Sequence, residues 1–206
     1  ASSALATASS AATAAAAVTA TTTPTTDPLV AHADSARIRG NPAAKVWMII
    51  ASDFQCPYCK MWHDSSDLTI RREYIDNGKV RLAFVNFPIN SHANAIPAAE
   101  HAMCAAAQDK FWQMHDALFA AQEKWAPLSD PRSALEQIAA SVGVDLTALR
   151  SCVSSHKMLP LIEADREKAA REWFDSDYAP LIETLREANE LGDGTETDAY
   201  LRVGPE

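Results

Sequence analysis

Two cysteines separated by two residues, in Cys56-Pro57-Tyr58-Cys59, form the segment whose residue types and spacing predict chemistry most directly. The segment follows an apolar run over residues 46–50 and precedes a helix-like stretch, which places Cys56 at the first turn of a helix. Unpaired backbone N–H groups and the positive end of the helix dipole stabilise a thiolate there. Pro57 suits that turn because it has no N–H to leave unpaired. We interpret the segment as a redox pair, with Cys56 as the accessible nucleophile and Cys59 as the more buried partner.

The same residues leave a metal-binding alternative open. His63 lies four residues after Cys59, on the same helical face, and could be a third ligand beside the two thiolates. Zinc sites of that type usually bring a second pair of ligands at close spacing, whereas the other cysteines, Cys104 and Cys152, stand alone. The strand-to-helix context therefore favours redox chemistry without a metal, with a metal-binding module or an inert structural disulfide as the alternatives.

Further motifs follow this segment along the chain in a fixed order. The full set is Gly40-Asn41-Pro42, Ser52 to Cys59, Asn86-Phe87-Pro88 with His92 and Asn94, Pro97-Ala98-Ala99-Glu100, and Lys110 to Phe119. In this order they resemble the DsbA-like branch of the thioredoxin superfamily, a group of extracytoplasmic thiol-disulfide oxidoreductases. The resemblance covers about residues 41–173.

The resemblance implies a thioredoxin-like α/β fold with a helical insertion at about residues 96–156. It implies an enzyme that needs no cofactor and oxidises secreted polypeptides, with Cys56 forming a mixed disulfide and Cys59 resolving it. Pro57 and Tyr58 would set the redox potential, and a membrane partner would re-oxidise the protein. An isomerase or reductase of the same family is the nearest alternative. Isomerases usually carry an N-terminal dimerisation domain, for which residues 1–40 are too short and polar, so we expect a monomer.

The elements that must position these residues can be read from apolar periodicity. Residues 46–54 predict a strand covered on both faces, residues 57–76 a helix stopped by Asn77-Gly78, and residues 80–87 a second strand. Such a βαβ unit pairs its strands in parallel. Residues 24–44 are expected to be a linker with a lead-in strand. Helices are then predicted over residues 96–108, 110–125, 133–142, 146–154 (N-capped by Asp145), 158–173 and 178–189, before a polar tail.

Composition limits the class of protein. The 206 residues are 48% hydrophobic, enough for one core, and the net charge of -9 argues against nucleic acid or an anionic membrane surface as partner. Residues 1–23 are almost wholly Ala, Ser and Thr, so residues 1–30 are expected to be disordered and residues 31–206 to form the domain. Four cysteines suit an oxidising compartment, periplasmic or secreted. The start at Ala1 fits removal of a secretion signal or trimming.

Several other residues are candidates for supporting roles. Cys104 and Cys152 fall in two helices of the insertion and are predicted to form a structural disulfide, with two buried free thiols as the alternative. Asp53 is expected to cap the active-site turn, or else to accept a proton. His63 and His92 are expected to pack or hydrogen bond, with tuning of the thiolate as the alternative.

Two features depart from or extend the family's pattern. Ile50 occupies the position, six before Cys56, where thioredoxins keep a buried acid, so proton transfer to Cys59 must use water or another group. The aromatic face of residues 111–119 is expected to pack in the core, and part of it, with Tyr58 and Trp62, could form an apolar patch for an unfolded substrate.

The family's cis-proline segment is not found. Thioredoxin-like proteins place a cis-proline in a loop facing the two cysteines, followed by a hairpin. Here Trp173 runs directly into Phe174, and the prolines that remain do not fit. Two strands and a turn need roughly 20 residues, so we expect a segment of that size to be absent from this sequence between Trp173 and Phe174.

Overall fold

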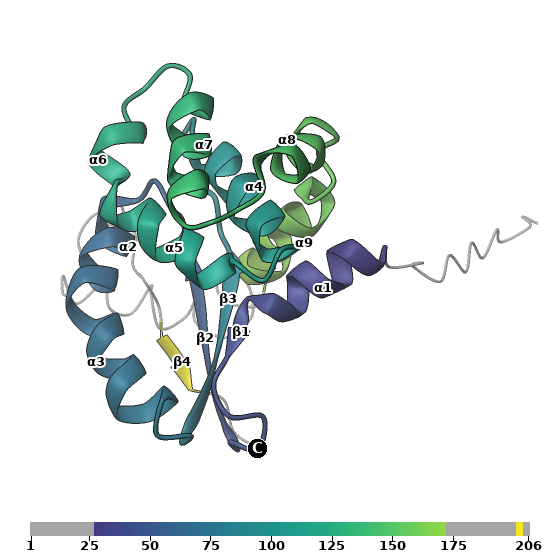
Figure 1. The fold of residues 1–206 in the computed structure, drawn as a ribbon. Helices are drawn as coiled ribbons and strands as arrows, with labels where there is room; N and C mark the ends of the chain where they lie inside the picture. The colour runs from purple at the N-terminus through teal and green to yellow at the C-terminus, as the bar shows by residue number, and fades with distance from the viewer. Residues whose placement is uncertain (1–26, 172–200, 204–206) are drawn as a thin grey trace, which may run out of the picture.

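The computed structural model describes residues 27–171 and 201–203, and within them one sheet lies between helices (Figure 1). The elements associated with the sheet are α1 (Pro28–Ala36), β1 (Ile38–Arg39), β2 (Val46–Ser52), α2 (Pro57–Trp62), α3 (Leu68–Ile70), β3 (Val80–Asn86) and β4 (Leu201–Val203). A π-helical segment, η1 (His63–Asp67), joins α2 to α3, and a second one, η2 (Arg71–Ile75), continues the same helix after α3. Gly78 follows this helix with a φ of +70°, which confirms the predicted stop signal.

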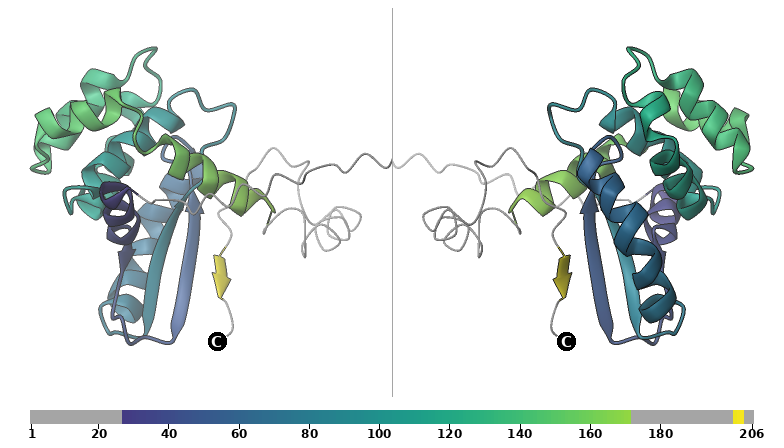
Figure 2. Two further views of the ribbon diagram at one scale, coloured as in Figure 1. Left: turned by 90° about the vertical axis from the view of Figure 1, so that its right-hand side faces the viewer. Right: turned by 90° about the vertical axis from the view of Figure 1, so that its left-hand side faces the viewer.

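The strand order is β1-β3-β2-β4. β2 and β3 are parallel, in register from Val46 opposite Val80 to Ser52 opposite Asn86, which confirms the predicted βαβ unit. At one edge β1 pairs antiparallel with β3, and at the other edge β4 pairs antiparallel with β2 (Figure 2). Two predictions are corrected here. Helix α1 occupies much of the stretch expected to be a linker, where Asp27 caps its first turn, and β4 lies in the expected polar tail.

The central strands are buried on one face rather than on both. Met48 and Ile50 pack with Leu82 and Ile75 in a buried cluster, whereas Trp47 on the opposite face of β2 is only half-buried. The Arg81 guanidinium lies over the Trp47 ring, 4.1 Å from its centroid. A long cationic side chain therefore covers a position for which the sequence predicted an apolar layer.

The helical insertion lies beyond the carboxyl ends of β2 and β3 (Figure 1). It comprises α4 (Ala95–Ala106), α5 (Phe111–Ala120), α6 (Gln122–Trp125), α7 (Arg132–Ser141) and α8 (Leu146–Ser154), and α9 (Leu159–Ala170) follows it. These helices confirm the predicted ones, except that the helix expected over residues 110–125 is divided at Ala121 into α5 and α6. Asp145 caps α8 by accepting from the Ala148 N–H.

The largest buried cluster fills the insertion and reaches the redox pair. Trp125, Phe111 and Met103 are almost completely buried within it, and Cys56 and Cys59 belong to the same cluster. A disulfide between Cys104 in α4 and Cys152 in α8 crosses this core, with the alpha carbons 5.8 Å apart. The insertion is thus a packed and cross-linked body against which the redox segment rests.

A buried ion pair fixes the end of β3 beside the site. Asp165 in α9 accepts hydrogen bonds from the guanidinium of Arg37, from the Asn86 N–H at 3.1 Å and from the Asn86 amide at 2.9 Å. Because Arg37 precedes β1 and Asn86 ends β3, this carboxylate joins three elements that are distant in the sequence.

Some predictions lie outside the described residues. They are the disorder expected over residues 1–26, the helix over residues 178–189, and the absent cis-proline segment between Trp173 and Phe174. The disorder expected as far as residue 30 is corrected at its end, because α1 begins at Pro28. In the described part of the chain, no helix combines the length and apolar character that a membrane span requires.

Candidate functional site

Cys56 lies between β2 and α2 and is the N-cap residue of α2. Its backbone is extended (φ −70°, ψ 124°), and Pro57 takes the first helical position. The Cys56 N–H donates to the Asp53 carbonyl at 3.1 Å, and the Cys56 carbonyl accepts the first helical bond, from the Lys60 N–H at 3.1 Å. The sulfur therefore sits where a helix begins, next to N–H groups that have no partner inside the helix.

The two thiols have opposite acidities. The pKa of Cys56 is lowered to about 6, mainly by a hydrogen bond from the Cys59 thiol and also by the backbone N–H groups of Cys59 and Tyr58, while burial and the Asp53 charge oppose this. The same thiol–thiolate bond raises the pKa of Cys59, and burial and the Cys56 charge raise it further. A hydrogen bond with the Ser52 hydroxyl partly opposes that rise. The pair therefore holds one proton, on Cys59, near neutral pH.

The expected contrast in accessibility is corrected by the structure. Cys56 is 2% exposed and Cys59 is 7% exposed, so neither thiol is open to solvent. Cys56 is covered because its turn is drawn against the core of the insertion together with Phe54. What distinguishes the two thiols is the set of hydrogen bonds to each sulfur, rather than exposed area.

Asp53 organises the turn before Cys56. One carboxylate oxygen accepts from the Gln55 N–H at 2.7 Å, and the other accepts from the Ile89 N–H at 2.8 Å and lies 2.7 Å from Nδ1 of His92. Burial raises the pKa of Asp53, although these hydrogen bonds oppose the rise. This geometry is that of a capping residue which also anchors the loop after β3, with both carboxylate oxygens engaged by the protein.

Three amide side chains that sequence reasoning had not assigned to the site hold the same turn. The Gln122 amide donates to the carbonyls of Phe54 and Cys56. Gln55 accepts from the Asn94 N–H at 2.7 Å and donates to the Ala126 carbonyl at 3.1 Å. Asn94 belonged to the family motif, but nothing local in the sequence distinguished Gln122 from other helical glutamines.

The helix that begins with α2 carries exposed apolar side chains. Tyr58 and Met61 are exposed, by 40% and 61%, and Leu68 is exposed further along the same helix. Trp62 points inward instead, where it packs on the Met48 cluster. The aromatic face of α5 is buried, which confirms its predicted place in the core. The predicted patch is therefore corrected in two ways: the aromatic face of α5 does not contribute to it, and Met61 is exposed in place of Trp62.

His63 joins a charged network rather than the thiols. Its Nδ1 lies 2.9 Å from Asp64 and its Nε2 3.4 Å from Asp116. These carboxylates raise the pKa of His63 despite the opposing effect of burial. Arg71 donates to both oxygens of Asp116, at 2.6 and 2.7 Å. The carboxylate is therefore already paired with a cation inside the protein.

This network bears on the metal alternative. Among the described residues, the group whose possible ligand atoms lie within 4.8 Å of one another is His63, His115 and Asp116. The set formed by Cys56, Cys59 and His63 is not brought together in that way. Since Arg71 already occupies Asp116, the group that does come together is an ion-pair network.

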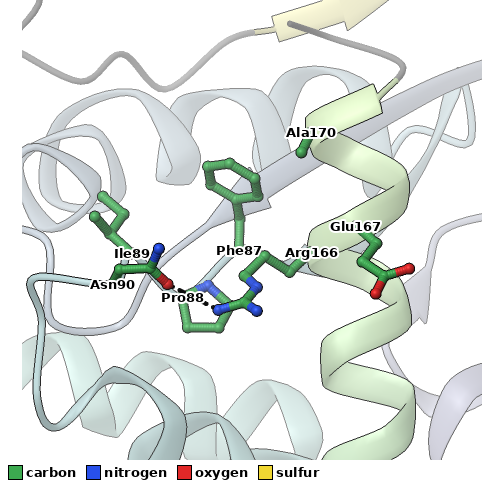
Figure 3. A pocket seen from close by; sticks show the side chains of 7 residues that line it. All are labelled: Phe87, Pro88, Ile89, Asn90, Arg166, Glu167 and Ala170. Atoms are coloured by element: carbon green, nitrogen blue, oxygen red, sulfur yellow. Dashed lines mark hydrogen bonds between the residues drawn. The ribbon is translucent and has the colours of Figure 1, made fainter. Parts of the chain in front are cut away.

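A pocket of about 450 Å³ opens next to the loop that follows β3. It is lined by Phe87, Pro88, Ile89, Asn90, Arg166, Glu167 and Ala170, and Figure 3 shows the Arg166 side chain crossing from α9 to Asn90. That bond measures 2.9 Å. The Ile89 N–H that binds Asp53 belongs to the same loop, so Asp53 connects the pocket wall to the turn over residues 53–56, called the redox turn below.

Comparisons with known proteins show what this chain is similar to. A family described as Thioredoxin matches residues 32–176. A "probable disulfide bond formation protein D" of Bacillus anthracis is 37% identical over 86 residues, which cover 41% of this chain and 40% of the relative. A Na(+)/H(+) antiporter NhaA 3 of Salinispora tropica is 32% identical over 149 residues, covering 72% of this chain and 20% of that protein. The chain therefore spans less than half the length of these curated relatives.

A solved structure extends the likeness to three dimensions. Alpha-DsbA1 of Wolbachia pipientis superposes with a TM-score of 0.60 at 26% identity, covering 68% of this chain and 70% of that one. The architecture of the described residues is accordingly the thioredoxin-like fold with a helical insertion.

Proposed function

This chain belongs to the thioredoxin family, and we propose that it is a DsbA-like thiol-disulfide oxidoreductase that forms or exchanges disulfides in extracytoplasmic polypeptides. The observation that carries the proposal is the place of Cys56 at the start of α2, one turn before Cys59, where the hydrogen bond from the Cys59 thiol and the N–H groups of Tyr58 and Cys59 lower the Cys56 pKa to about 6 while the Cys59 pKa is raised. A thiolate stabilised at a helix start is a good leaving group and a competent nucleophile.

In the oxidising direction, the cycle starts from a Cys56–Cys59 disulfide. A substrate thiolate attacks the Cys56 sulfur, a mixed disulfide forms, and the Cys56–Cys59 bond breaks with its electron pair on Cys59, which takes a proton. A second substrate thiolate then attacks the substrate sulfur of the mixed disulfide, and Cys56 leaves as a thiolate. The substrate loses two electrons and the cysteine pair gains them.

The environment of Cys56 favours this direction over reduction or isomerisation. Stabilising the Cys56 thiolate stabilises the reduced protein, and a stable reduced form makes the disulfide a stronger oxidant. The Cys104–Cys152 disulfide in the insertion is consistent with an oxidising compartment. We further propose polypeptide substrates bearing cysteine thiols and re-oxidation by a membrane partner.

The test uses the oxidised chain and a reduced peptide that carries two cysteines. Cyclisation of the peptide, with one disulfide consumed per peptide oxidised, is the expected result. Cys56→Ser should abolish it, and reduced Cys59→Ser should accumulate a mixed disulfide with an oxidised peptide, because the resolving thiol is gone. A wild-type protein whose cysteine pair fails to oxidise the peptide, and which equilibrates with glutathione as a reductant, would overturn the assignment as an oxidase.

A further inference from the structure

Gln122 is the point at which the insertion contacts the backbone of the redox turn. It is the first residue of α6 and is 5% exposed. Its amide nitrogen donates to the Phe54 carbonyl at 2.8 Å and to the Cys56 carbonyl at 3.0 Å, across 68 and 66 positions of sequence. One donor group therefore holds the two peptide carbonyls on either side of Gln55.

These carbonyls determine how the turn enters the helix. At Cys56 the backbone changes from extended to helical, and the Cys56 carbonyl is shared between Gln122 and the Lys60 N–H. Fixing that carbonyl fixes the peptide plane between Cys56 and Pro57, and with it the direction in which the Tyr58 and Cys59 N–H groups point. Those N–H groups are the backbone donors to the Cys56 sulfur. Without Gln122 the Cys56 carbonyl would keep the Lys60 N–H as a donor, whereas the Phe54 carbonyl would lose its side-chain donor.

The neighbouring amides brace the turn without reaching the cysteines. Gln55 and Asn94 both bind the Ala126 carbonyl, and Asn94 also binds the Leu128 carbonyl at 2.7 Å. They connect the turn to the segment between α6 and α7. Of these three amides, Gln122 is the one that bonds to the backbone of Cys56.

We propose that Gln122 is a positioning residue of the redox site, through which the helical insertion holds the N-terminal turn of α2 in the orientation that directs its N–H groups to the Cys56 sulfur. The inference rests on the proposed function and goes beyond it, because it assigns control of Cys56 reactivity to a side chain outside the cysteine segment and outside the sheet.

The test compares Gln122→Met with a matched control, Gln108→Met. Methionine has nearly the shape of glutamine but lacks the N–H donor. Gln108 also bonds within the insertion, accepting from the Asp145 N–H at 2.8 Å and donating to its carbonyl at 3.3 Å, but these bonds link α4 to α8. Both variants lose amide hydrogen bonds, and only one of them loses the bond to Cys56.

Three quantities are measured for each protein: the Cys56 pKa from the ultraviolet absorbance of the thiolate, the equilibrium of the cysteine pair with glutathione, and thermal stability. We expect Gln122→Met to raise the Cys56 pKa by about half a unit or more, with a shift of about threefold in the glutathione equilibrium toward the disulfide. Gln108→Met should leave the pKa and the glutathione equilibrium at their wild-type values. If Gln122→Met does not fold, Gln122→Asn, which is too short to reach both carbonyls, should give the same direction of change.

The outcomes separate this inference from the proposed function. A folded Gln122 variant with a wild-type Cys56 pKa and glutathione equilibrium would overturn the positioning role, even if its stability fell. A wild-type Cys56 that titrates near the free-thiol value of about 8.5 would instead refute the proposed function itself.

Discussion

Nδ1 of His92 lies 2.7 Å from Oδ2 of Asp53, which ties the loop after β3 to the turn that precedes Cys56. Asp53 is 2% exposed, so its carboxylate acts within the protein interior. Its charge opposes formation of the Cys56 thiolate, while its hydrogen bonds build the turn that exposes the sulfur to N–H donors. The hydrogen bonds of Asp53 and its charge thus have opposite effects on the Cys56 thiolate.

Removing the negative charge of Asp53 should show how much it raises the Cys56 pKa. In Asp53→Asn the amide oxygen can still accept from the Gln55 N–H, but the negative charge is gone. We expect the Cys56 pKa to fall below about 6, because the Asp53 charge raises it in the wild type. Thiolate absorbance during acid titration measures the shift. Asp64→Asn, which neutralises an exposed carboxylate on the helix that follows Cys56, serves as the control. A rise of the Cys56 pKa in Asp53→Asn would contradict the electrostatic assignment.

The stability of the reduced protein should depend on pH through Cys56. The folded pKa of about 6 lies below the unfolded value of about 8.5, so between these pH values the unfolded chain binds a proton that the native protein does not. The free energy of unfolding should therefore rise with pH across that window. The contribution is fully present above about pH 8.5 and is lost as the pH falls through about 6. Denaturant unfolding of reduced wild type and of Cys56→Ser provides the comparison, and parallel pH profiles would rule the linkage out.

The Cys104–Cys152 disulfide should stabilise the insertion without tuning the redox pair. It closes a loop with a sequence separation of 48, for which the chain-entropy model gives about 4 kcal/mol. We expect the double variant Cys104→Ala/Cys152→Ala to lose free energy of unfolding of that order and to keep the wild-type Cys56 pKa. Denaturant unfolding and thiol titration measure the two effects. A large change in the Cys56 pKa would mean that this disulfide also shapes the site.

The buried carboxylate of Asp165 should contribute more to stability than an exposed one. Asp165→Asn leaves the buried Arg37 guanidinium with Asp34 as its remaining carboxylate partner, and breaking a buried pair typically costs about 3–5 kcal/mol. We expect a loss of about 3 kcal/mol in the free energy of unfolding. Asp130→Asn, which removes a solvent-exposed partner of Arg132, should change stability little. Equal effects of the two substitutions would show that the Asp165 network is not a structural anchor.

Local sequence signals predicted most of the elements of the described residues and placed Cys56 at the start of a helix. Apolar runs, Pro57 at a helix start, Gly78 at a helix end and the Asp145 cap each act within a few residues, so they can be recognised without knowing the fold. The parallel pairing of β2 and β3 followed from the length of the crossover between them. The spacing of Cys56 and Cys59 also acts within one helical turn, because it places the Cys59 thiol and the N–H groups of Tyr58 and Cys59 beside the Cys56 sulfur.

The tertiary structure alone decided how these parts act on one another. The Gln122 bond to the Cys56 carbonyl and the Arg71–Asp116 pair join residues at least 45 positions apart, and Cys56 is buried in a cluster that includes the insertion. β4 likewise pairs with β2 across most of the chain. Such contacts leave no periodicity or cap in the sequence, because a glutamine that holds a buried carbonyl and one that faces solvent look alike there. The sequence determined that Cys56 lies at a helix start, where a thiolate is favoured, and the packing of the insertion determined what surrounds and positions it.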